Sequence, residues 1–337
     1  MTLITNPTRV HFADDVLQEA LQAELERAGC KHPLLVAENT LMEGEFADRI
    51  HAGLPHLVRP NQLSFARQSD LKTQVRALVE EDYTPDVIIA FGSARAIELS
   101  RKCRYALAQK NRRRPLLFAV PGIDGMPNPC TRNLESWRAG LPSILICDPT
   151  VALNADQNQS LRAVVISLVR CVESYLADAF NPPADGMALD GLSRCVKILP
   201  RTVNENNLNL QREVMAAGLN AAFSQEKGIG PASVLTSILM DADDELDEAE
   251  LARLILTGVV RTLEVNSEKE DTLLNVLGGD ENSLEYAVAR VLEWAPKPRC
   301  LSDLGLSRPH LDAAASNATG RAGLSFDSAR ALLDDVY

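Results

Sequence analysis

The sequence has no excess of positive charge. Its 34 lysines and arginines are outnumbered by 46 aspartates and glutamates, which gives a formal net charge of −12. Nucleic acids and anionic membranes both favour a basic face on a protein partner. We therefore expect neither of them as a partner, and we expect the acidic residues to form a solvated surface.

Paired cysteines, a secretory leader and a long apolar run are missing as well. None of the seven cysteines belongs to a CxxC pair, and their odd number argues against a disulfide framework or a zinc knuckle. No charged-then-apolar leader opens the chain, and it has no stretch of about 18 apolar residues. These features predict a cytoplasmic protein with reduced thiols. The cysteines are Cys30, Cys103, Cys130, Cys147, Cys171, Cys195 and Cys300.

What the sequence does contain is a change of pattern near its middle. Its 337 residues suit two domains with well-buried cores. Strands and helices alternate as far as Asp148-Pro149, and helical periodicity dominates after it. This predicts a Rossmann-like α/β domain with a mostly parallel sheet over residues 1–150 and an all-helical domain over residues 151–337. The predicted strands cover residues 7–12, 33–37, 86–90 and 115–120, and the predicted helices cover residues 16–28, 68–81 and 94–107.

A candidate phosphate-binding turn follows the strand at residues 86–90. Phe91, Gly92 and Ser93 lead directly into a helix, and the N–H groups and dipole at a helix N-terminus can hold a phosphate. Glu38 ends the strand at residues 33–37, where a parallel α/β sheet often places an acid for a ribose hydroxyl. A residue of a surface loop is the alternative for Glu38. We name Glu38, Gly92 and Ser93 as candidate cofactor-binding residues.

The segment from Ala163 to Asp185 has the spacing of an amphipathic helix that ends at Asn181-Pro182-Pro183. Its string CVESYLADAFNPPAD resembles the core-helix motif of the iron-containing (group III) alcohol dehydrogenase family, D-x-x-x-H-x-x-E-x-Y followed by N-P-x-x-D. The opening string NPTRVHF is most similar to the maleylacetate reductase branch of that family. The resemblance implies the two-domain architecture shared with dehydroquinate synthase, an NAD(P) cofactor, a divalent metal, and a homodimer formed through the N-terminal strand. The matching residues are Glu173, Tyr175, Asn181, Pro182 and Asp185.

The metal ligands that the resemblance implies are missing. The four ligand positions fall on Ile166, Arg170, Ser233 and approximately Ala249, and a further, often catalytic, histidine falls on Ser237. Isoleucine and arginine cannot bind a metal cation, and the five histidines of the chain lie outside these segments. We therefore predict that no metal binds. One acidic run lacks the glycine and bidentate glutamate of a calcium loop and is interpreted as solvated: Asp241, Asp243, Asp244 and Glu245.

The cofactor motifs of the family are altered too. Its phosphate turn, GGGS, reads Ala90, Phe91, Gly92 and Ser93 in this chain. Glycine lets a pyrophosphate approach the backbone closely, so we expect Ala90 and Phe91 to crowd the turn and make NAD(P) binding weak or absent. Gly125 matches the glycine of the family's next loop, which adds it to the candidate cofactor-binding residues.

A few polar side chains remain as candidates for catalysis. Arg170 could hold a carboxylate or an oxyanion, or it could pair with Glu173 or another acid on its own helix turn. Lys227 is either a second cation near the cleft or a solvated turn residue. Ser233 and Ser237 share one helical face, and they either act in catalysis or fill the space of lost imidazoles.

Two classes of function remain open. We favour a repurposed scaffold that has lost the metal-dependent chemistry, because the ligand positions, the second histidine and the phosphate glycines have changed together. Such a protein would serve as a binding, regulatory or partner subunit, with a small anionic ligand between its domains or a protein partner. The alternative is a metal-independent, NAD(P)H-dependent reductase of a small carboxylated carbonyl substrate, similar to maleylacetate reductase, with Arg170 at the centre of its anion pocket.

Overall fold

The structure is a computed structural model that divides into two compact units, the first ending at Ala155 and the second running from Asp156 to Tyr337. The predicted fold class, an α/β domain with a parallel sheet followed by a helical domain, is confirmed. The residues that the structure describes are 8–55, 58, 60–65, 73, 76–77, 80, 83–111, 114–123, 125–126, 141–153, 155–240, 246–262, 266–279, 283–295 and 300–337.

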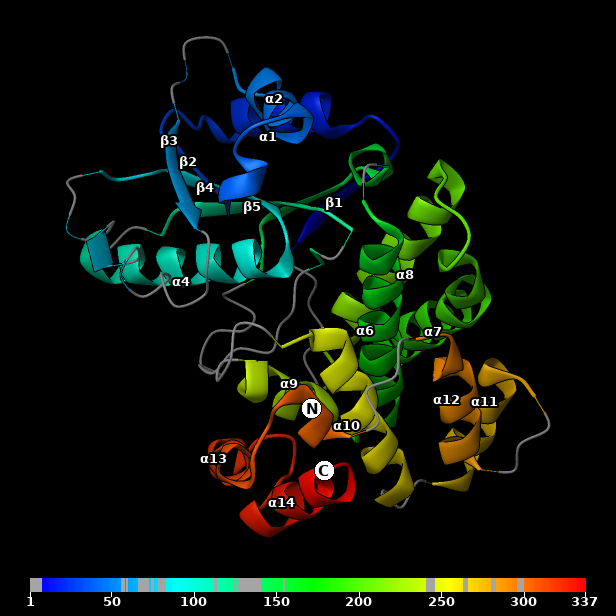
Figure 1. Cartoon of the computed structure of the whole chain (residues 1–337). Coiled ribbons are helices and arrows are strands. Elements are labelled where there is room, and N and C mark those ends of the chain that lie inside the picture. Colours follow the sequence, from blue (N-terminus) through cyan, green and yellow to red (C-terminus); the bar gives the residue numbers. More distant parts are fainter. Residues whose placement is uncertain are drawn as a thin grey trace. The chain divides into compact units, whose positions relative to one another are not determined.

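A six-stranded sheet forms the centre of the first unit, and all of its strand pairs are parallel (Figure 1). Its order is β1-β6-β5-β4-β2-β3, and the inner strands are buried along nearly their whole length. Such burial explains their continuous apolar runs, because a parallel sheet is covered on both faces. The strands are β1 (Arg9–Phe12), β2 (Pro33–Glu38), β3 (Asn61–Phe65), β4 (Val87–Gly92), β5 (Leu116–Pro121) and β6 (Ile144–Cys147).

Helices cover both faces of this sheet. Helices α1 (Leu17–Ala28) and α2 (Glu45–Ala52) lie over one face, and α4 (Ala94–Asn111) lies along the other (Figure 1). Two short 3-10 helices, Asn39–Leu41 and Pro149–Ala152, follow β2 and β6. The predicted helix at residues 68–81 falls largely outside the described residues.

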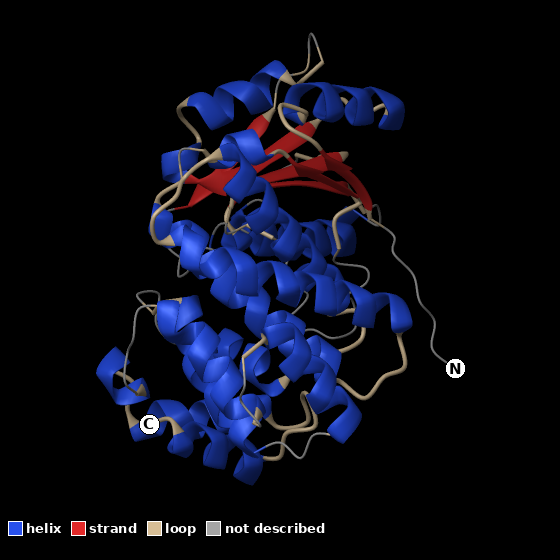
Figure 2. Ribbon diagram, turned by 90° about the vertical axis from the view of Figure 1, so that its right-hand side faces the viewer, coloured by secondary structure: helices blue, strands red, loops and turns tan. Residues whose placement is uncertain are grey.

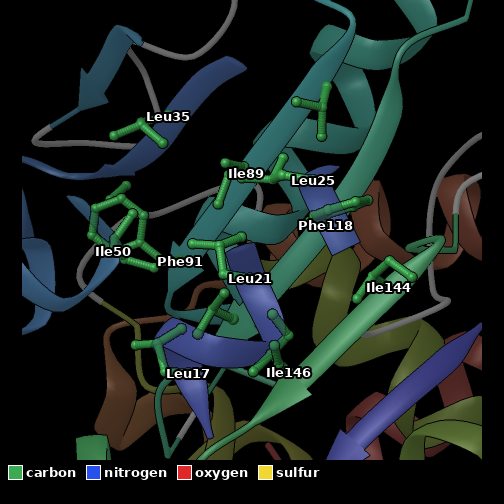
Figure 3. Close-up of a cluster of buried hydrophobic side chains, with 14 of the residues drawn as sticks. Leu17, Leu21, Leu25, Leu35, Ile50, Ile89, Phe91, Phe118, Ile144 and Ile146 are labelled. Atoms are coloured by element: carbon green, nitrogen blue, oxygen red, sulfur yellow. The ribbon is translucent and has the colours of Figure 1, made fainter. Parts of the chain in front are cut away.

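The core of the first unit lies between the sheet and α1 (Figure 3). Leu17, Leu21 and Leu25 recur at helical spacing on α1, so all three reach the sheet. They pack among side chains of one sheet face, which include Ile89 and Phe91 of β4. This packing determines which face of β4 points into the core and which strand ends are left for a site.

The second unit is helical throughout its described residues, whereas the described strands gather in the one sheet (Figure 2). Helix α6 (Gln157–Leu176) is its central element and packs against α7, α8, α9 and α10. Asn181 begins α7 by accepting a hydrogen bond from Ala184 N at 3.3 Å, and prolines follow it at the first helical positions, which explains the N-P-P string. None of the described helices meets the length and hydropathy that a membrane-spanning helix needs. The helices after α6 are α7 (Pro182–Thr202), α8 (Leu208–Ser224), α9 (Pro231–Met240), α10 (Glu248–Thr262), α11 (Ser267–Leu277), α12 (Leu284–Val291), α13 (Arg308–Ala318) and α14 (Phe326–Asp335), with 3-10 helices at Leu292–Trp294 and Leu301–Leu304.

Candidate active site

The four residues predicted to bind a cofactor meet at one edge of the sheet. Glu38 ends β2 and Gly92 ends β4, and β4 pairs in register with β5, so that Gly92 lies beside Pro121. Because all strands are parallel, these residues are at the carboxyl ends of neighbouring strands, where open α/β sheets bind ligands. Ser93 and Gly125 lie in the loops that follow β4 and β5.

Close packing requires glycine at two of these positions. Gly92 has a φ of +103°, and a Cβ there would lie 2.4 Å from Leu41 Cδ1 and 2.8 Å from Glu38 Oε2. A Cβ on Gly125 would lie 1.9 Å from the carbonyl oxygen of Gly92. That same oxygen accepts a hydrogen bond from Gly122 N at 2.8 Å. The two loops therefore touch backbone to backbone, and this packing within the protein is what requires glycine at both positions.

Ser93 connects Glu38 to the start of α4. Its hydroxyl donates to Glu38 Oε1 and accepts from Arg95 N at 3.2 Å and from Ala96 N at 3.4 Å. The serine thus caps the positive end of α4 and brings a carboxylate beside it. An acid in this place can accept hydrogen bonds from a ribose diol.

The expected crowding by Phe91 is wrong. Its side chain is fully buried, and its ring centroid lies 5.4 Å from that of Phe46 on α2. Side chains alternate along a strand, so Phe91 lies on the same face of β4 as Val87 and Ile89, among the core residues of Figure 3. It occupies the core under α1 and α2 and leaves the space over the turn free of its ring.

In the second unit, Arg170 is buried on α6 and is only 5% exposed. Its Nη2 donates to Glu248 Oε1 at 3.2 Å, so its partner comes from α10 and not from its own helix turn. Arg170 also acts electrostatically on Glu173, which lies almost one turn further along α6. The structure therefore shows Arg170 paired with an acid, and its role in holding an anion stays a prediction.

A second ion pair joins the same two helices. Arg162, two turns before Arg170, pairs with Asp247 at 2.5 Å. Asp247 also accepts hydrogen bonds from the N–H groups of Ala249 and Glu250, which begin α10. Arg162, Ile166 and Arg170 are spaced four residues apart and so share one face of α6. The two arginines on this face pair with acids at the start of α10.

Beside this contact lies a pocket. Its lining residues are Asn158, Leu161, Arg162, Val165, Asp247, Ala249, Glu250, Arg253 and Ala295.

Ser233 and Glu173 form a buried hydrogen-bonded pair. The Ser233 hydroxyl donates to Glu173 Oε2 at 2.6 Å, and the backbone N–H groups of Ser233 and Ala232 also donate to this carboxylate. Burial raises the pKa of Glu173 to about 7, although these donors and the charge of Arg170 each lower it. A Cβ on Gly230 would lie 2.4 Å from Glu173 Oε1, which explains the glycine at this position.

The other candidates have structural partners or lie apart from this pair. Ser237, one turn further along α9, is partly buried, and no hydrogen bond among the described residues joins it to Glu173. Lys227 is neither solvated nor available as a free cation. Its ammonium group donates to Tyr175 O at 2.7 Å and to Asp185, and its side chain is 2% exposed. It ties the end of α6 to the start of α7.

The residues at the four ligand positions do not fit a metal. Ile166 and Ala249 offer hydrocarbon, Arg170 offers a fixed cation, and the Ser233 hydroxyl is already bonded to Glu173. Among the described residues no cluster of three or more histidine, cysteine, aspartate or glutamate side chains could hold an ion. The acidic run at residues 241–245 lies outside the described part of the chain.

Comparison with known proteins identifies dehydrogenases and reductases. No family model matches the chain. A 4-hydroxybutyrate dehydrogenase from Cupriavidus necator is 25% identical over 295 residues, which are 77% of each chain. The solved structure of maleylacetate reductase from Agrobacterium tumefaciens matches with a TM-score of 0.76 and 17% identity, covering 100% of this chain and 97% of that one. Sulfoacetaldehyde reductase from Bifidobacterium kashiwanohense, in complex with NAD+, matches with a TM-score of 0.80 and 14% identity, covering 100% and 98%.

These comparisons contradict the favoured prediction of a repurposed scaffold. The sequence relative and the structural neighbours are named as dehydrogenases, oxidoreductases or reductases, and the alternative prediction of a reductase agrees with these names better.

Proposed function

We propose that this chain, which belongs to the iron-containing alcohol dehydrogenase family, is an NAD(P)H-dependent reductase that works without a metal. Its substrate class is a small aldehyde or ketone that bears a carboxylate. The observation that carries the proposal is the buried Arg170 guanidinium, held by Glu248. It stands at a position where the family's motif has a metal ligand.

Arg170 supplies a permanent positive charge, because a guanidinium stays protonated in proteins. One of its five N–H donors is bonded to Glu248 among the described residues. The remaining donors can bond to the carbonyl oxygen of a substrate, where negative charge develops during reduction. Arg170 thereby polarises the carbonyl group, which is the role that a Lewis acid has in metal-dependent enzymes.

The cluster of Glu38, Gly92, Ser93 and Gly125 fits a dinucleotide. The close backbone approach of the two glycines supports a pyrophosphate site, and Phe91 does not obstruct it. The carboxylate of Glu38 favours NADH over NADPH, because it accepts hydrogen bonds from a ribose diol and repels a 2′-phosphate. A reduced nicotinamide, when bound, supplies the hydride that the carbonyl carbon accepts.

A carboxylate on the substrate is supported by two of the similar proteins. 4-Hydroxybutyrate and maleylacetate, after which two of the similar proteins are named, both carry carboxylates. The pocket between α6 and α10 contains two guanidinium groups, those of Arg162 and Arg253, together with the carboxylates of Asp247 and Glu250. Arg162 is paired with Asp247 and the charge of Glu250 acts on Arg253, so a substrate carboxylate in this pocket would compete with these two acids for the cations.

A turnover screen tests this proposal. The purified protein is mixed with NADH or NADPH and with small aldehydes and ketones in matched pairs, one member with a carboxylate and one without. We expect NADH oxidation with a carboxylated substrate and at least a tenfold lower kcat/KM for its uncharged analogue. Arg201→Ala is the control, since Arg201 forms a surface pair with Glu205 and should leave turnover unchanged. The absence of turnover with every pair would refute the proposal.

A further inference from the structure

A carbonyl reduction also needs a proton, and Arg170 is a poor source for it. A guanidinium donates hydrogen bonds but does not act as a proton donor in catalysis near neutral pH. The reacting oxygen therefore needs a second group on the protein that can give up a proton and take it back. The buried pair of Ser233 and Glu173 has so far been assigned no chemical role.

We infer that Ser233 and Glu173 form the proton-delivery path of this enzyme. Ser233 donates its hydroxyl proton to the substrate oxygen, and Glu173 is the acid that returns a proton to Ser233. The inference rests on the proposed function, because it assigns the proton of the same reduction. Ser233 is a catalytic residue in this account. Glu173 acts through Ser233 and also positions it.

The geometry supports a relay because the two groups share a short hydrogen bond. The Ser233 hydroxyl donates to Glu173 Oε2 at 2.6 Å, and a proton can pass from the protonated carboxyl group to Ser233 Oγ over this distance once the hydroxyl has turned toward the substrate. Glu173 is 3% exposed and Ser233 is 7% exposed, so the path is separated from bulk water. The backbone N–H groups of Ala232 and Ser233 hold the carboxylate in place.

Arg170 also acts electrostatically on the carboxylate of Glu173. Glu173 follows Arg170 by three residues on α6. The positive charge of Arg170 lowers the pKa of Glu173 and so favours the ionised carboxylate. The cation that holds the substrate oxygen and the acid that supplies its proton are thus carried by one helix.

The step balances as follows. The carbonyl carbon accepts a hydride with its two electrons from the reduced nicotinamide, and the π electrons of the C=O bond move to the oxygen. That oxygen forms a bond to the Ser233 proton, and the Oγ–H bond breaks. Ser233 Oγ takes the proton of the Glu173 carboxylic acid, which leaves a carboxylate that regains a proton from solvent. Alcohol oxidation runs through the same groups in reverse.

The pKa of Glu173 suits this role. Burial raises it to about 7, so the carboxyl group exchanges its proton near neutral pH, whereas an ordinary glutamate would be almost fully ionised there. An acid or base with a pKa near the working pH is the most effective. Arg170 and the three donors from Ser233 and Ala232 lower this pKa, and removing any of them should raise it further.

A purely structural role for Glu173 is the competing explanation. The carboxylate accepts from the first turn of α9, and such a contact stabilises a helix N-terminus. A structural contact changes the free energy of unfolding, but it does not determine the pH profile or the solvent isotope effect of turnover. The test therefore depends on those two measurements and not on stability alone.

Ser233→Ala is the decisive variant, because it removes the hydroxyl and leaves both backbone hydrogen bonds to Glu173. We expect a fall in kcat of about 10²-fold or more with little change in KM, since proton transfer by a positioned group contributes about 10²–10⁴-fold. The solvent deuterium isotope effect and the pH dependence near 7 should change with it. Ser233→Thr retains a hydroxyl and should recover much of kcat. Ser167→Ala is the matched control, because that buried α6 hydroxyl bonds to Ala163 O of its own helix and to no other group in the described part of the chain.

A second readout does not depend on turnover. Infrared difference spectra between pH 5 and pH 9 should contain a carboxylic acid band that titrates near pH 7 and is missing in Glu173→Gln. If that variant does not fold, Ser233→Ala serves in its place. It should move the midpoint upward, because the lost hydroxyl lowers the pKa of Glu173.

A failure of the relay and a failure of the proposed reductase function give different results. Unchanged kcat, pH profile and isotope effect in Ser233→Ala, in a preparation whose unmodified protein turns over, would overturn the relay and leave the reductase standing. No turnover by the unmodified protein would overturn the reductase, and the relay with it.

Discussion

Arg170 on α6 and Glu248 on α10 are 78 residues apart in the sequence, and the guanidinium donates to the carboxylate at 3.2 Å. A second pair, Arg162 with Asp247, lies two turns away along α6. Two cationic side chains thus join α6 to the acidic first turn of α10. In the proposed function, a fixed guanidinium supplies the charge that a metal would supply, and it needs no histidine ligands.

The contact between the two cofactor loops can be tested with a pair of glycine substitutions. Gly125→Ala would place a Cβ 1.9 Å from Gly92 O, so we expect it to lower the free energy of unfolding by more than about 1 kcal/mol and to weaken NADH binding. Gly186 is exposed on α7 and has nothing within 4 Å of a new Cβ, so Gly186→Ala should instead stabilise by about 0.5–1 kcal/mol. Urea unfolding and NADH titration measure both effects. Equal stability of the two variants would contradict the described loop contact.

Phe91 provides a test of the corrected cofactor site. If its ring obstructed the phosphate turn, Phe91→Gly would tighten NADH binding. Because the ring is fully buried in the core, we expect Phe91→Ala to cost about 3–5 kcal/mol and to give no tighter binding. Phe180→Ala, at a side chain that is 77% exposed, should change stability by less than about 0.5 kcal/mol. Tighter NADH binding by a folded Phe91 variant would restore the crowding explanation.

The sequence predicted most of the fold because buried parallel strands are short apolar runs that alternate with helices. It did not predict β3, since the segment NQLSF contains only two apolar side chains. The direction of Phe91 could have been predicted, because the alternation along β4 places it on the face of Val87 and Ile89. The prediction of crowding rested on the identity of the turn residues alone. It did not take into account that side chains alternate between the two faces of a strand.

The candidate site was predictable only in part. The cofactor residues meet because parallel strands bring their carboxyl ends to one edge, and this follows from the strand pattern. The pairing of Arg170 with Glu248 depends on how α10 packs against α6, and no local pattern contains that information. The sequence predicted that Lys227 lies in a turn. Its burial against Tyr175 and Asp185 could not be predicted, because it depends on how the ends of three helices pack together. The close contact of Gly230 with Glu173, which requires a glycine there, likewise became visible only in the structure.

Glu38 should set the choice between NADH and NADPH. Glu38→Gln removes the charge that repels a 2′-phosphate and keeps an acceptor for Ser93. We expect the ratio of the dissociation constants of NADPH and NADH to fall about fivefold, which corresponds to about 1 kcal/mol for a partly exposed charge pair. Calorimetric titration with both cofactors measures it. The exposed Glu43→Gln is the control, and an unchanged ratio in Glu38→Gln would show that this acid does not face the ribose.

Glu173 should make the stability of the protein depend on pH. Its pKa is raised to about 7 in the folded state from an ordinary 4.5, so the folded protein binds more protons than the unfolded chain between those values. The free energy of unfolding should therefore fall as the pH rises from about 4.5 to 7 and stay lower above it, with a change on the order of a few kcal/mol. Glu173→Gln should flatten this dependence in urea unfolding curves. An equal slope in both proteins would mean that Glu173 is ionised throughout.

The central claim is that an arginine performs the role of the metal, and one measurement tests it most directly. Turnover of NADH with a carboxylated aldehyde is followed for protein treated with a chelator, before and after addition of iron or zinc. Arg170→Ala and Arg170→Lys are measured beside the unmodified protein. We predict full activity after chelation, no gain on adding metal, a loss of about 10²-fold or more in Arg170→Ala, and a smaller loss in Arg170→Lys. Activity that disappears with the chelator and returns with the metal, or that survives in Arg170→Ala, would contradict the account.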